Sequence, residues 1–321
     1  MFSTRHERLD TFTLYGMTRS FTVAAAQLGP SSNTKAQTVE RMVALIQEAG
    51  RRNVELLTFS ELSLTPYFAT RVREDWQDFP EDGLPSPLTQ PLFEAGRQAG
   101  LHWVFPFAER ENGQVYNTAV LIDPTGTVVQ KYRKAHIPGV VEPRWEGLDI
   151  FEKRYFTEGN LGFPVTALQT GESARLGMLI CYDRRFSEAY RALALGGAEL
   201  ICIPYNTPTF GRPREEGHET AEILLRAAAI ENQVFIVAAG KAGVEDGAEY
   251  IGGSEVISPE GKILAKAQTD GDELVVATID LDAITQLKAK WDFMPDRRPE
   301  LYQPLTDEDG TPTESAGKRE R

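Results

Sequence analysis

The order of apolar segments predicts an α/β protein built as a four-layer α-β-β-α sandwich. Segments with the length and composition of buried strands alternate with segments of helical periodicity. Hairpin signals interrupt this alternation, so each sheet is expected to be mixed. The succession of elements also occurs twice, in two comparable halves. Two sheets packed face to face, with helices on the outer faces of one domain, satisfy these three observations.

The first half contains alternating strand and helix signals followed by a meander. The dipeptide Asn112-Gly113 is the strongest short-range signal for a hairpin. Pro124-Thr125-Gly126 marks a further turn. The expected elements, in order, are strand 21–27, helix 34–52, strand 54–59, helix 87–100 and strands 101–110, 114–123 and 127–132.

A long segment punctuated by Gly and Pro, residues 134–164, follows the meander. Such a segment inside a compact domain is usually functional. The expected elements of the second half are strand 175–180, helix 186–195, strand 199–204, helix 215–232, strand 234–240 and strand-like runs at 250–258, 262–268 and 273–280.

Composition limits the class of protein. The chain has 321 residues, of which 41% are hydrophobic and 25% charged, with a net charge of −13, which argues against nucleic acid and anionic membranes as partners. No apolar run approaches the roughly 20 residues that a membrane span needs, and the polar N-terminal residues do not predict a secretory signal. Cys181 and Cys202 lie in apolar runs, which favours reduced thiols in the cytoplasm. The four histidines lack ligand spacing, so no metal site is predicted.

The ends of the chain differ from its centre. Residues 1–19 are charged and without periodicity, so an N-terminal extension is expected. Residues 20–305 are expected to form a single domain, and the polar residues 306–321 a disordered tail.

Cys181 is the central candidate for a catalytic residue. It lies between a predicted strand that ends at Ile180 and a helical pattern that begins at Phe186. This arrangement is that of a nucleophile elbow with Cys in place of Ser. Asp183 is expected to cap the helix, and the free N–H groups of the helix are expected to favour the thiolate. The alternative is a buried cysteine that acts as a small hydrophobe.

Glu61 and Lys134 also directly follow predicted strands. Each alone is typical of an exposed and inert side chain. A thiolate nucleophile, a carboxylate that carries its proton and an ammonium that stabilises an oxyanion are together sufficient to hydrolyse an amide-type bond without a metal.

Three windows resemble, in order, the Glu-Lys-Cys signatures of the nitrilase (carbon–nitrogen hydrolase) superfamily. They are Phe59-Ser60-Glu61-Leu62, Lys131-Tyr132-Arg133-Lys134-Ala135-His136 and Ile180-Cys181-Tyr182-Asp183-Arg184-Arg185-Phe186. The resemblance covers about residues 21–305 and implies the αββα fold, no cofactor, a cytoplasmic location and a homodimer or homotetramer. It implies catalytic roles for Glu61, Lys134 and Cys181, and Glu152 falls where the family often carries a second, supporting glutamate.

Residues 151–164 and 205–209 are similar to the N-carbamoyl-D-amino acid amidohydrolases. This implies cleavage of an N-carbamoyl amino acid to ammonia, carbon dioxide and the amino acid through a thioester-like intermediate. Arg184 and Arg185 would then bind the substrate carboxylate. Further substrate contacts are expected from Asn206, Thr207, His136 and the backbone N–H of Tyr182. The plainer alternatives are structural ion pairs for the arginines, a turn for Asn206-Thr207 and a loop cap for His136.

Three positions depart from that branch. The carbamoylases have Asn where this chain has Tyr182, and His where it has Ile150. They also carry a His-rich loop where residues 210–218 read FGRPREEGH. Because these positions are expected to touch the substrate, the chemistry transfers better than the specificity.

Two other classes of function stay open. The chain is alternatively a nitrilase or an amidase that acts on another small amide or nitrile. A binding protein that merely keeps the fold is the second alternative, but the presence of all three signature residues argues against it. The mostly apolar segment 291–305 is expected to pack across a two-fold interface.

Overall fold

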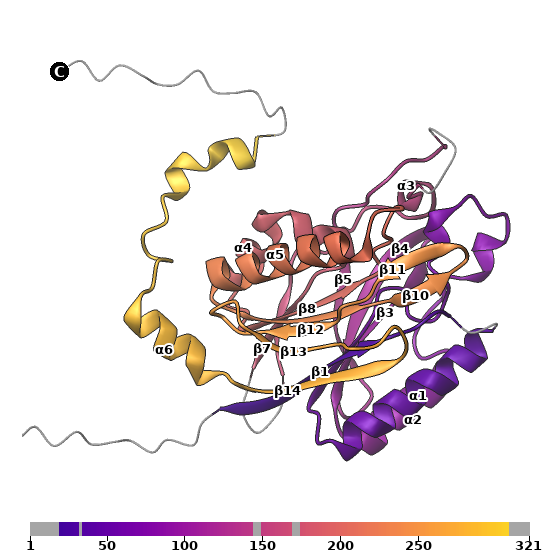
Figure 1. The fold of residues 1–321 in the computed structure, drawn as a ribbon, viewed down its shortest axis with the longest axis horizontal. Helices are drawn as coiled ribbons and strands as arrows, with labels where there is room; N and C mark the ends of the chain where they lie inside the picture. The colour runs from indigo at the N-terminus through magenta and orange to yellow at the C-terminus, as the bar shows by residue number, and fades with distance from the viewer. Residues whose placement is uncertain (1–18, 32–33, 144–148, 169–173, 308–321) are drawn as a thin grey trace, which may run out of the picture.

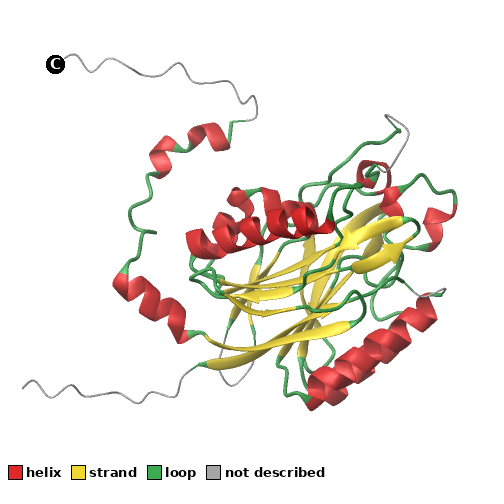
Figure 2. Ribbon diagram, in the orientation of Figure 1, coloured by secondary structure: helices red, strands yellow, loops and turns green. Residues whose placement is uncertain are grey.

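Two six-stranded sheets pack face to face between layers of helices (Figures 1 and 2). The computed structural model describes residues 19–31, 34–143, 149–168 and 174–307. The expected extension 1–19 and tail 306–321 therefore lie almost entirely outside the described residues. The predicted four-layer α-β-β-α class is confirmed.

The first sheet has the strand order β14-β1-β2-β3-β4-β5. Strands β1, β2 and β3 are parallel, and the remaining pairings are antiparallel. The bounds are β1 (Ser20–Gln27), β2 (Leu56–Phe59), β3 (His102–Glu111), β4 (Gln114–Ile122), β5 (Val128–Arg133) and β14 (Glu273–Asp280).

The second sheet has the order β13-β12-β9-β8-β7-β6, with β7, β8 and β9 parallel. A separate ribbon pairs β10 with β11. The bounds are β6 (Val165–Ala167), β7 (Arg175–Met178), β8 (Leu200–Tyr205), β9 (Phe235–Gly240), β10 (Ala242–Glu245), β11 (Ala248–Ile251), β12 (Glu255–Ile257) and β13 (Ile263–Lys266).

Helices cover the outer faces of both sheets, with α1 and α2 on one side and α4 and α5 on the other (Figure 1). The Thr34 side chain caps α1 by accepting the N–H of Gln37. The helices are α1 (Lys35–Arg51), α2 (Gln90–Ala99), α3 (Glu152–Tyr155), α4 (Ser187–Leu195), α5 (Arg214–Asn232) and α6 (Asp282–Lys290). Short 3-10 turns are η1 (Phe68–Thr70), η2 (Asp75–Asp78), η3 (Cys181–Arg185), η4 (Pro299–Leu301) and η5 (Gln303–Leu305).

Period-two alternation places the main core between the sheets. Val23 and Ala25 of β1 belong to the apolar cluster that joins the two sheets, whereas Ala24 and Ala26 belong to the cluster beneath α1 and α2. The Asn112-Gly113 hairpin is also confirmed, because β3 and β4 pair around it and both turn residues have positive φ.

The predicted strand over 250–258 is wrong as a single element. Gly252 and Gly253 both adopt left-handed φ angles, of 59° and 73°, and this reverses the extended chain. The segment before them is β11 of the ribbon, and the segment after them is β12 of the second sheet.

The last strand, β14, belongs to the sheet that is otherwise formed by the first half of the chain. β14 pairs antiparallel with β1 along eight residues, from Ser20 opposite Asp280 to Gln27 opposite Glu273. Beyond it, α6 and the two 3-10 turns extend away from the body (Figure 1). In the described part of the chain, no helix is long and apolar enough to cross a membrane.

Candidate active site

Four predicted catalytic residues meet where strands of the two sheets end. Glu61 follows β2 and Lys134 follows β5 in the first sheet, and Cys181 follows β7 in the second. Glu152 reaches the same point from α3, which lies in the long segment after β5. The exposed fraction of Glu61, Lys134 and Glu152 is 0%. Such burial of charge requires mutual pairing.

Lys134 lies between the two carboxylates. Its Nζ donates to Oε1 of Glu61 at 2.9 Å and to both carboxylate oxygens of Glu152 at 2.7 Å. Burial alone would lower the pKa of Lys134, but the charges of Glu152 and Glu61 raise it well above its ordinary value. The side chain is therefore an ammonium at neutral pH.

Glu152 is a weaker acid than an ordinary glutamate. Burial raises its pKa to about 7, with Lys134 opposing the shift and the charge of Glu61 adding to it. The hydroxyl of Tyr67 donates to its carboxylate. Glu152 therefore contacts Lys134 on one side and Tyr67 on the other, which holds the ammonium in place.

The Glu61 carboxylate also accepts hydrogen bonds from two asparagines. Oε1 also accepts Nδ2 of Asn117 at 2.7 Å, and Oε2 accepts the backbone N–H of Asn206 at 2.9 Å. These donors come from β4 of the first sheet and from the end of β8 in the second. The carboxylate is thus oriented from both sheets.

Cys181 occupies a strained turn. Its φ is +46°, in the left-handed region that a residue with a Cβ rarely adopts. Its Sγ donates to the backbone carbonyl of Asn206 at 3.7 Å. The side chain is 8% exposed, and the residue lines the cavity described below. The expected nucleophile-elbow geometry is present, with a 3-10 turn in place of the start of an α-helix.

The expectation of a thiolate favoured by the turn was wrong. Burial, followed by the charge of Glu61, raises the pKa of Cys181 to about 12, and Lys134 and Arg184 oppose this only in part. Cys181 is therefore a thiol in the free protein. A nucleophile in this site needs a base to remove its proton.

The sequence predicted that Asp183 caps the following helix, but in the structure its side chain does not cap α4. Its carboxylate accepts the backbone N–H of Ile180 at 2.9 Å and the hydroxyl of Tyr132 at 2.7 Å. It also contacts Nδ1 of His136 at 2.7 Å. The His136 ring stacks on Phe186 and is not among the residues that line the cavity. His136 and Asp183 thus brace the turn that carries Cys181.

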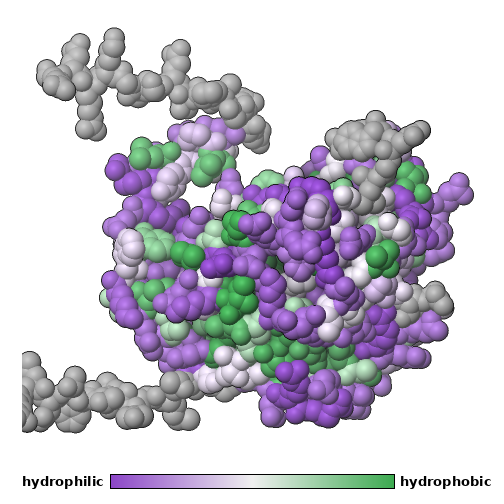
Figure 3. Space-filling model, in the orientation of Figure 1, coloured by the Kyte–Doolittle hydropathy of each residue, from purple (hydrophilic) through white to green (hydrophobic). Residues whose placement is uncertain are grey.

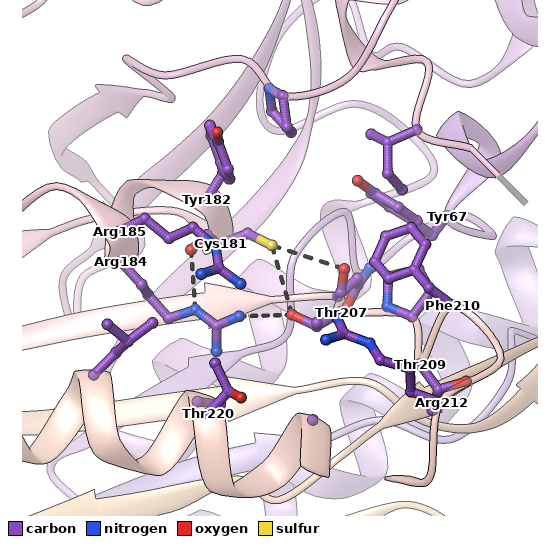
Figure 4. A pocket seen from close by; sticks show the side chains of 17 residues that line it. Tyr67, Cys181, Tyr182, Arg184, Arg185, Thr207, Thr209, Phe210, Arg212 and Thr220 are labelled. Atoms are coloured by element: carbon purple, nitrogen blue, oxygen red, sulfur yellow. Dashed lines mark hydrogen bonds between the residues drawn. The ribbon is translucent and has the colours of Figure 1, made fainter. Parts of the chain in front are cut away.

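A cavity of about 270 Å³ opens beside Cys181. Its walls come from η3, the segment after β8, the start of α5 and the segment after β5 (Figure 4). The lining residues include Cys181, Tyr182, Asn206 and Thr207, which were expected to contact substrate, and Ile150. Among the described residues that line this cavity, Arg184, Arg185 and Arg212 are the charged ones, and none is an Asp or Glu.

The two consecutive arginines have different surroundings. Arg184 is buried, with Nε donating to the Cys181 carbonyl at 3.0 Å and Nη2 to the Thr207 hydroxyl at 2.6 Å. Its guanidinium also lies over the ring of Tyr205. Arg185 is exposed, and among the described residues no carboxylate pairs with it. Nη1 of Arg184 is buried and has no partner among the described residues, so Arg185 is the one of the two whose donors are exposed at the cavity.

Sequence reasoning missed three residues that complete the site. Asn117 and Tyr67 each contact a buried carboxylate, and Arg212 lines the cavity. A polar Asn within the otherwise apolar β4 was the one local signal available for Asn117. Within the described residues, no group of three or more His, Cys, Asp or Glu side chains is arranged to hold a metal ion.

Comparisons with known proteins identify the family of this chain. A family model described as carbon-nitrogen hydrolase matches residues 22–289. An N-carbamoylputrescine amidase from Arabidopsis thaliana is 31% identical over 308 residues, covering 92% of this chain and 98% of the relative. A nitrilase from Pyrococcus abyssi is 33% identical over 285 residues, covering 87% and 98%. The crystal structure of a carbon-nitrogen hydrolase from Helicobacter pylori G27 has a TM-score of 0.80 and 26% identity, covering 90% of this chain and 99% of that one.

The predicted superfamily is therefore confirmed, whereas the predicted branch is not. Neither curated relative bears the name of an N-carbamoyl-D-amino acid amidohydrolase. The chain belongs to the carbon–nitrogen hydrolase family and is an amidohydrolase of the nitrilase superfamily.

Proposed function

We propose that the protein hydrolyses the carbamoyl group of an N-carbamoyl amino acid, with Cys181 as nucleophile and Arg185 as the ligand of the substrate carboxylate. The observation that carries the proposal is the charge of the cavity. Exposed arginine side chains line it beside Cys181, and none of the described residues that line it is acidic. A planar guanidinium suits a carboxylate, to which it donates two parallel hydrogen bonds.

The first half-reaction forms a covalent intermediate. Glu61 takes the proton of Cys181, and the sulfur attacks the ureido carbonyl carbon. Lys134, whose pKa is raised, and the backbone N–H of Tyr182 stabilise the oxyanion. One such donor is typically worth about 3 kcal/mol. Glu61 then passes the proton to the departing ammonia, leaving the carbamoyl carbon bonded to sulfur.

The second half-reaction regenerates the thiol. Glu61 removes a proton from water, and the hydroxide displaces the sulfur, which recovers its proton. The product is a carbamate, which loses carbon dioxide to leave the amino acid. Glu152 contributes by holding Lys134, and Tyr67, which also lines the cavity, contributes by holding Glu152.

The charge of the cavity disfavours a cationic substrate. A substrate such as N-carbamoylputrescine ends in an ammonium, which would face Arg185 and Arg212 with no carboxylate to pair with among the described lining residues. A neutral amide or nitrile is the second candidate. Such a substrate would use Cys181, Glu61 and Lys134 in the same way and leave Arg185 without a ligand.

The test compares substrates that differ in charge. Turnover would be followed by ammonia release from N-carbamoyl-alanine, N-carbamoylputrescine, a neutral amide of similar size and the matching nitrile. We expect the highest kcat/KM for N-carbamoyl-alanine. Arg185→Ala is expected to lower that value roughly ten- to hundredfold, because charge-assisted hydrogen bonds are worth about 1.5–3 kcal/mol. Arg185→Lys should rescue only part of it.

The neutral amide is the matched control. Its kcat/KM should change little in Arg185→Ala, since it has no carboxylate to lose. Equal losses on both substrates would show that Arg185 does not bind a carboxylate and would leave an amidohydrolase of a neutral substrate. Arg184→Ala is expected to lower both values, because Arg184 holds Thr207 and the carbonyl of the nucleophile.

A further inference from the structure

The cavity carries one more cation than an N-carbamoyl amino acid with a single carboxylate requires. Arg184 has its Nε and Nη2 occupied by the protein and its Nη1 buried, so it counts as part of the wall. Arg185 and Arg212 are both exposed and both line the cavity. Among the described residues neither forms an ion pair, although the chain as a whole has a net charge of −13.

Arg212 is positioned by an anchored turn. The segment after β8 pairs with β11, with the N–H of Ile251 donating to the Thr207 carbonyl at 3.0 Å and the N–H of Thr209 to the Glu249 carbonyl at 2.8 Å. Phe210 and Gly211 then adopt left-handed φ angles, of 54° and 73°, and reverse the chain. The N–H of Arg212 closes the turn on the Thr209 carbonyl at 3.1 Å.

Arg214, a nearby arginine, differs from Arg212 because its side chain has partners within the protein. Arg214 lies two residues further on, at the start of α5. Its Nε donates to the Ile251 carbonyl at 2.9 Å, and its Nη1 pairs with Asp270. Arg212 has no such partner among the described residues and reaches the cavity from the segment before α5, whereas Arg185 reaches it from η3 (Figure 4).

We propose that Arg212 forms a second anion-binding subsite, so that the preferred substrates are N-carbamoyl amino acids whose side chain ends in a carboxylate. The inference rests on the proposed function. A substrate with one carboxylate neutralises one guanidinium and leaves the other unpaired in the same cavity. A ureido dicarboxylate places one carboxylate on Arg185 and the other on Arg212, which neutralises both.

The activity test compares N-carbamoyl-glutamate and N-carbamoyl-aspartate with N-carbamoyl-alanine. We expect the wild type to prefer a dicarboxylate at least tenfold in kcat/KM. Arg212→Ala and Arg212→Gln should lower kcat/KM for dicarboxylates ten- to hundredfold and for N-carbamoyl-alanine less than threefold. Arg212→Glu should go further and raise kcat/KM for N-carbamoylputrescine. The matched control is Arg51→Ala, which removes an exposed arginine from α1 on the other outer face and should change none of these values.

A second measurement does not depend on the reaction. Alkylation of Cys181 by neutral iodoacetamide would be timed with glutarate, succinate or butyrate present. Protection by a dicarboxylate at a tenfold lower concentration than butyrate, lost in Arg212→Ala, supports the subsite even where no carbamoyl compound is turned over. In that case only the proposed function fails. Equal protection by mono- and dicarboxylates, or equal losses on all carbamoyl substrates in Arg212→Ala, would overturn the subsite.

Discussion

Glu61 and Asn206 hold each other across the two sheets. Oε2 of Glu61 accepts the backbone N–H of Asn206 at 2.9 Å, and Nδ2 of Asn206 donates to the backbone carbonyl of Glu61 at 2.7 Å. Glu61 follows β2 of the first sheet and Asn206 follows β8 of the second. The packing of one sheet on the other therefore sets the position of the proposed base.

Replacing Asn206 should weaken catalysis through the position of Glu61. Asn206→Ala removes the Nδ2 donor and leaves a buried carbonyl without it, a change worth about 1–3 kcal/mol. We expect kcat to fall roughly tenfold or more. Asn232→Ala is the matched control, because this buried side chain donates to the Ala228 carbonyl within α5. Similar loss of kcat in both variants would mean that only stability had changed.

The two cysteines should differ sharply. Cys181→Ala is expected to abolish turnover and keep the fold. Cys202 lies fully buried in the middle of β8, and burial raises its pKa to about 12, which is typical of a packed core thiol. Cys202→Ala should retain most of the activity and lose about 1 kcal/mol of stability. Ammonia release measures turnover, and urea unfolding measures stability. An active Cys181→Ala variant would exclude the mechanism.

Glu255 should make stability depend on pH. It is 2% exposed on β12, and burial raises its pKa from 4.5 to about 7. The folded protein thus holds this proton more tightly than the unfolded chain, so stability falls as pH rises from about 4.5 to about 7. We expect the free energy of unfolding of Glu255→Gln to exceed that of the wild type by roughly 1–3 kcal/mol at pH 8 and to differ little from it at pH 5.

Urea unfolding at several pH values measures this difference. Glu48→Gln, at an exposed site on α1, is the control and should leave the pH dependence of the wild type unchanged. If the free energies of unfolding of Glu255→Gln and the wild type differ by the same amount at pH 5 and pH 8, the raised pKa of Glu255 is contradicted.

The buried pair of Lys241 and Glu245 should contribute to stability as a coupled unit. Nζ of Lys241 contacts both carboxylate oxygens of Glu245, at 2.7 and 2.6 Å, and Glu245 accepts the backbone N–H of Tyr67 at 2.8 Å. Lys241→Met leaves a buried charge and should cost about 3–5 kcal/mol. The double variant with Glu245→Gln should recover part of that loss in urea unfolding. Additive losses would contradict a coupled pair.

The C-terminal arm, residues 291–305, should be covered by a second copy of the chain. Trp291, Leu301 and Leu305 are 74%, 62% and 64% exposed, and Figure 3 shows hydrophobic side chains on this arm. Such exposure is uncommon on a monomer. We expect light scattering to show a homodimer or larger assembly at micromolar concentration, and Leu301→Glu with Leu305→Glu to weaken it. A wild-type monomer would contradict this prediction.

Much of the local structure follows from the sequence, because it depends on neighbouring residues. The helical spacing in α1 and the Asn112-Gly113 turn predict their elements correctly. The apolar run of 250–258 did not, because its direction changes at Gly252 and Gly253. A glycine accepts an extended or a left-handed backbone, and the choice between them was made by the pairing of β11 with β10 and of β12 with β9.

The residue types of the active site were also determined by the sequence, since three spaced windows carry Glu61, Lys134 and Cys181. Only the tertiary structure decided what each does to the others. Burial at the junction of two sheets keeps Cys181 a thiol, whereas the charges of Glu152 and Glu61 keep the buried Lys134 an ammonium, because the cost of a charge depends on what surrounds it in space. For the same reason two adjacent arginines diverge: Arg184 meets backbone and Thr207, while Arg185 faces the cavity.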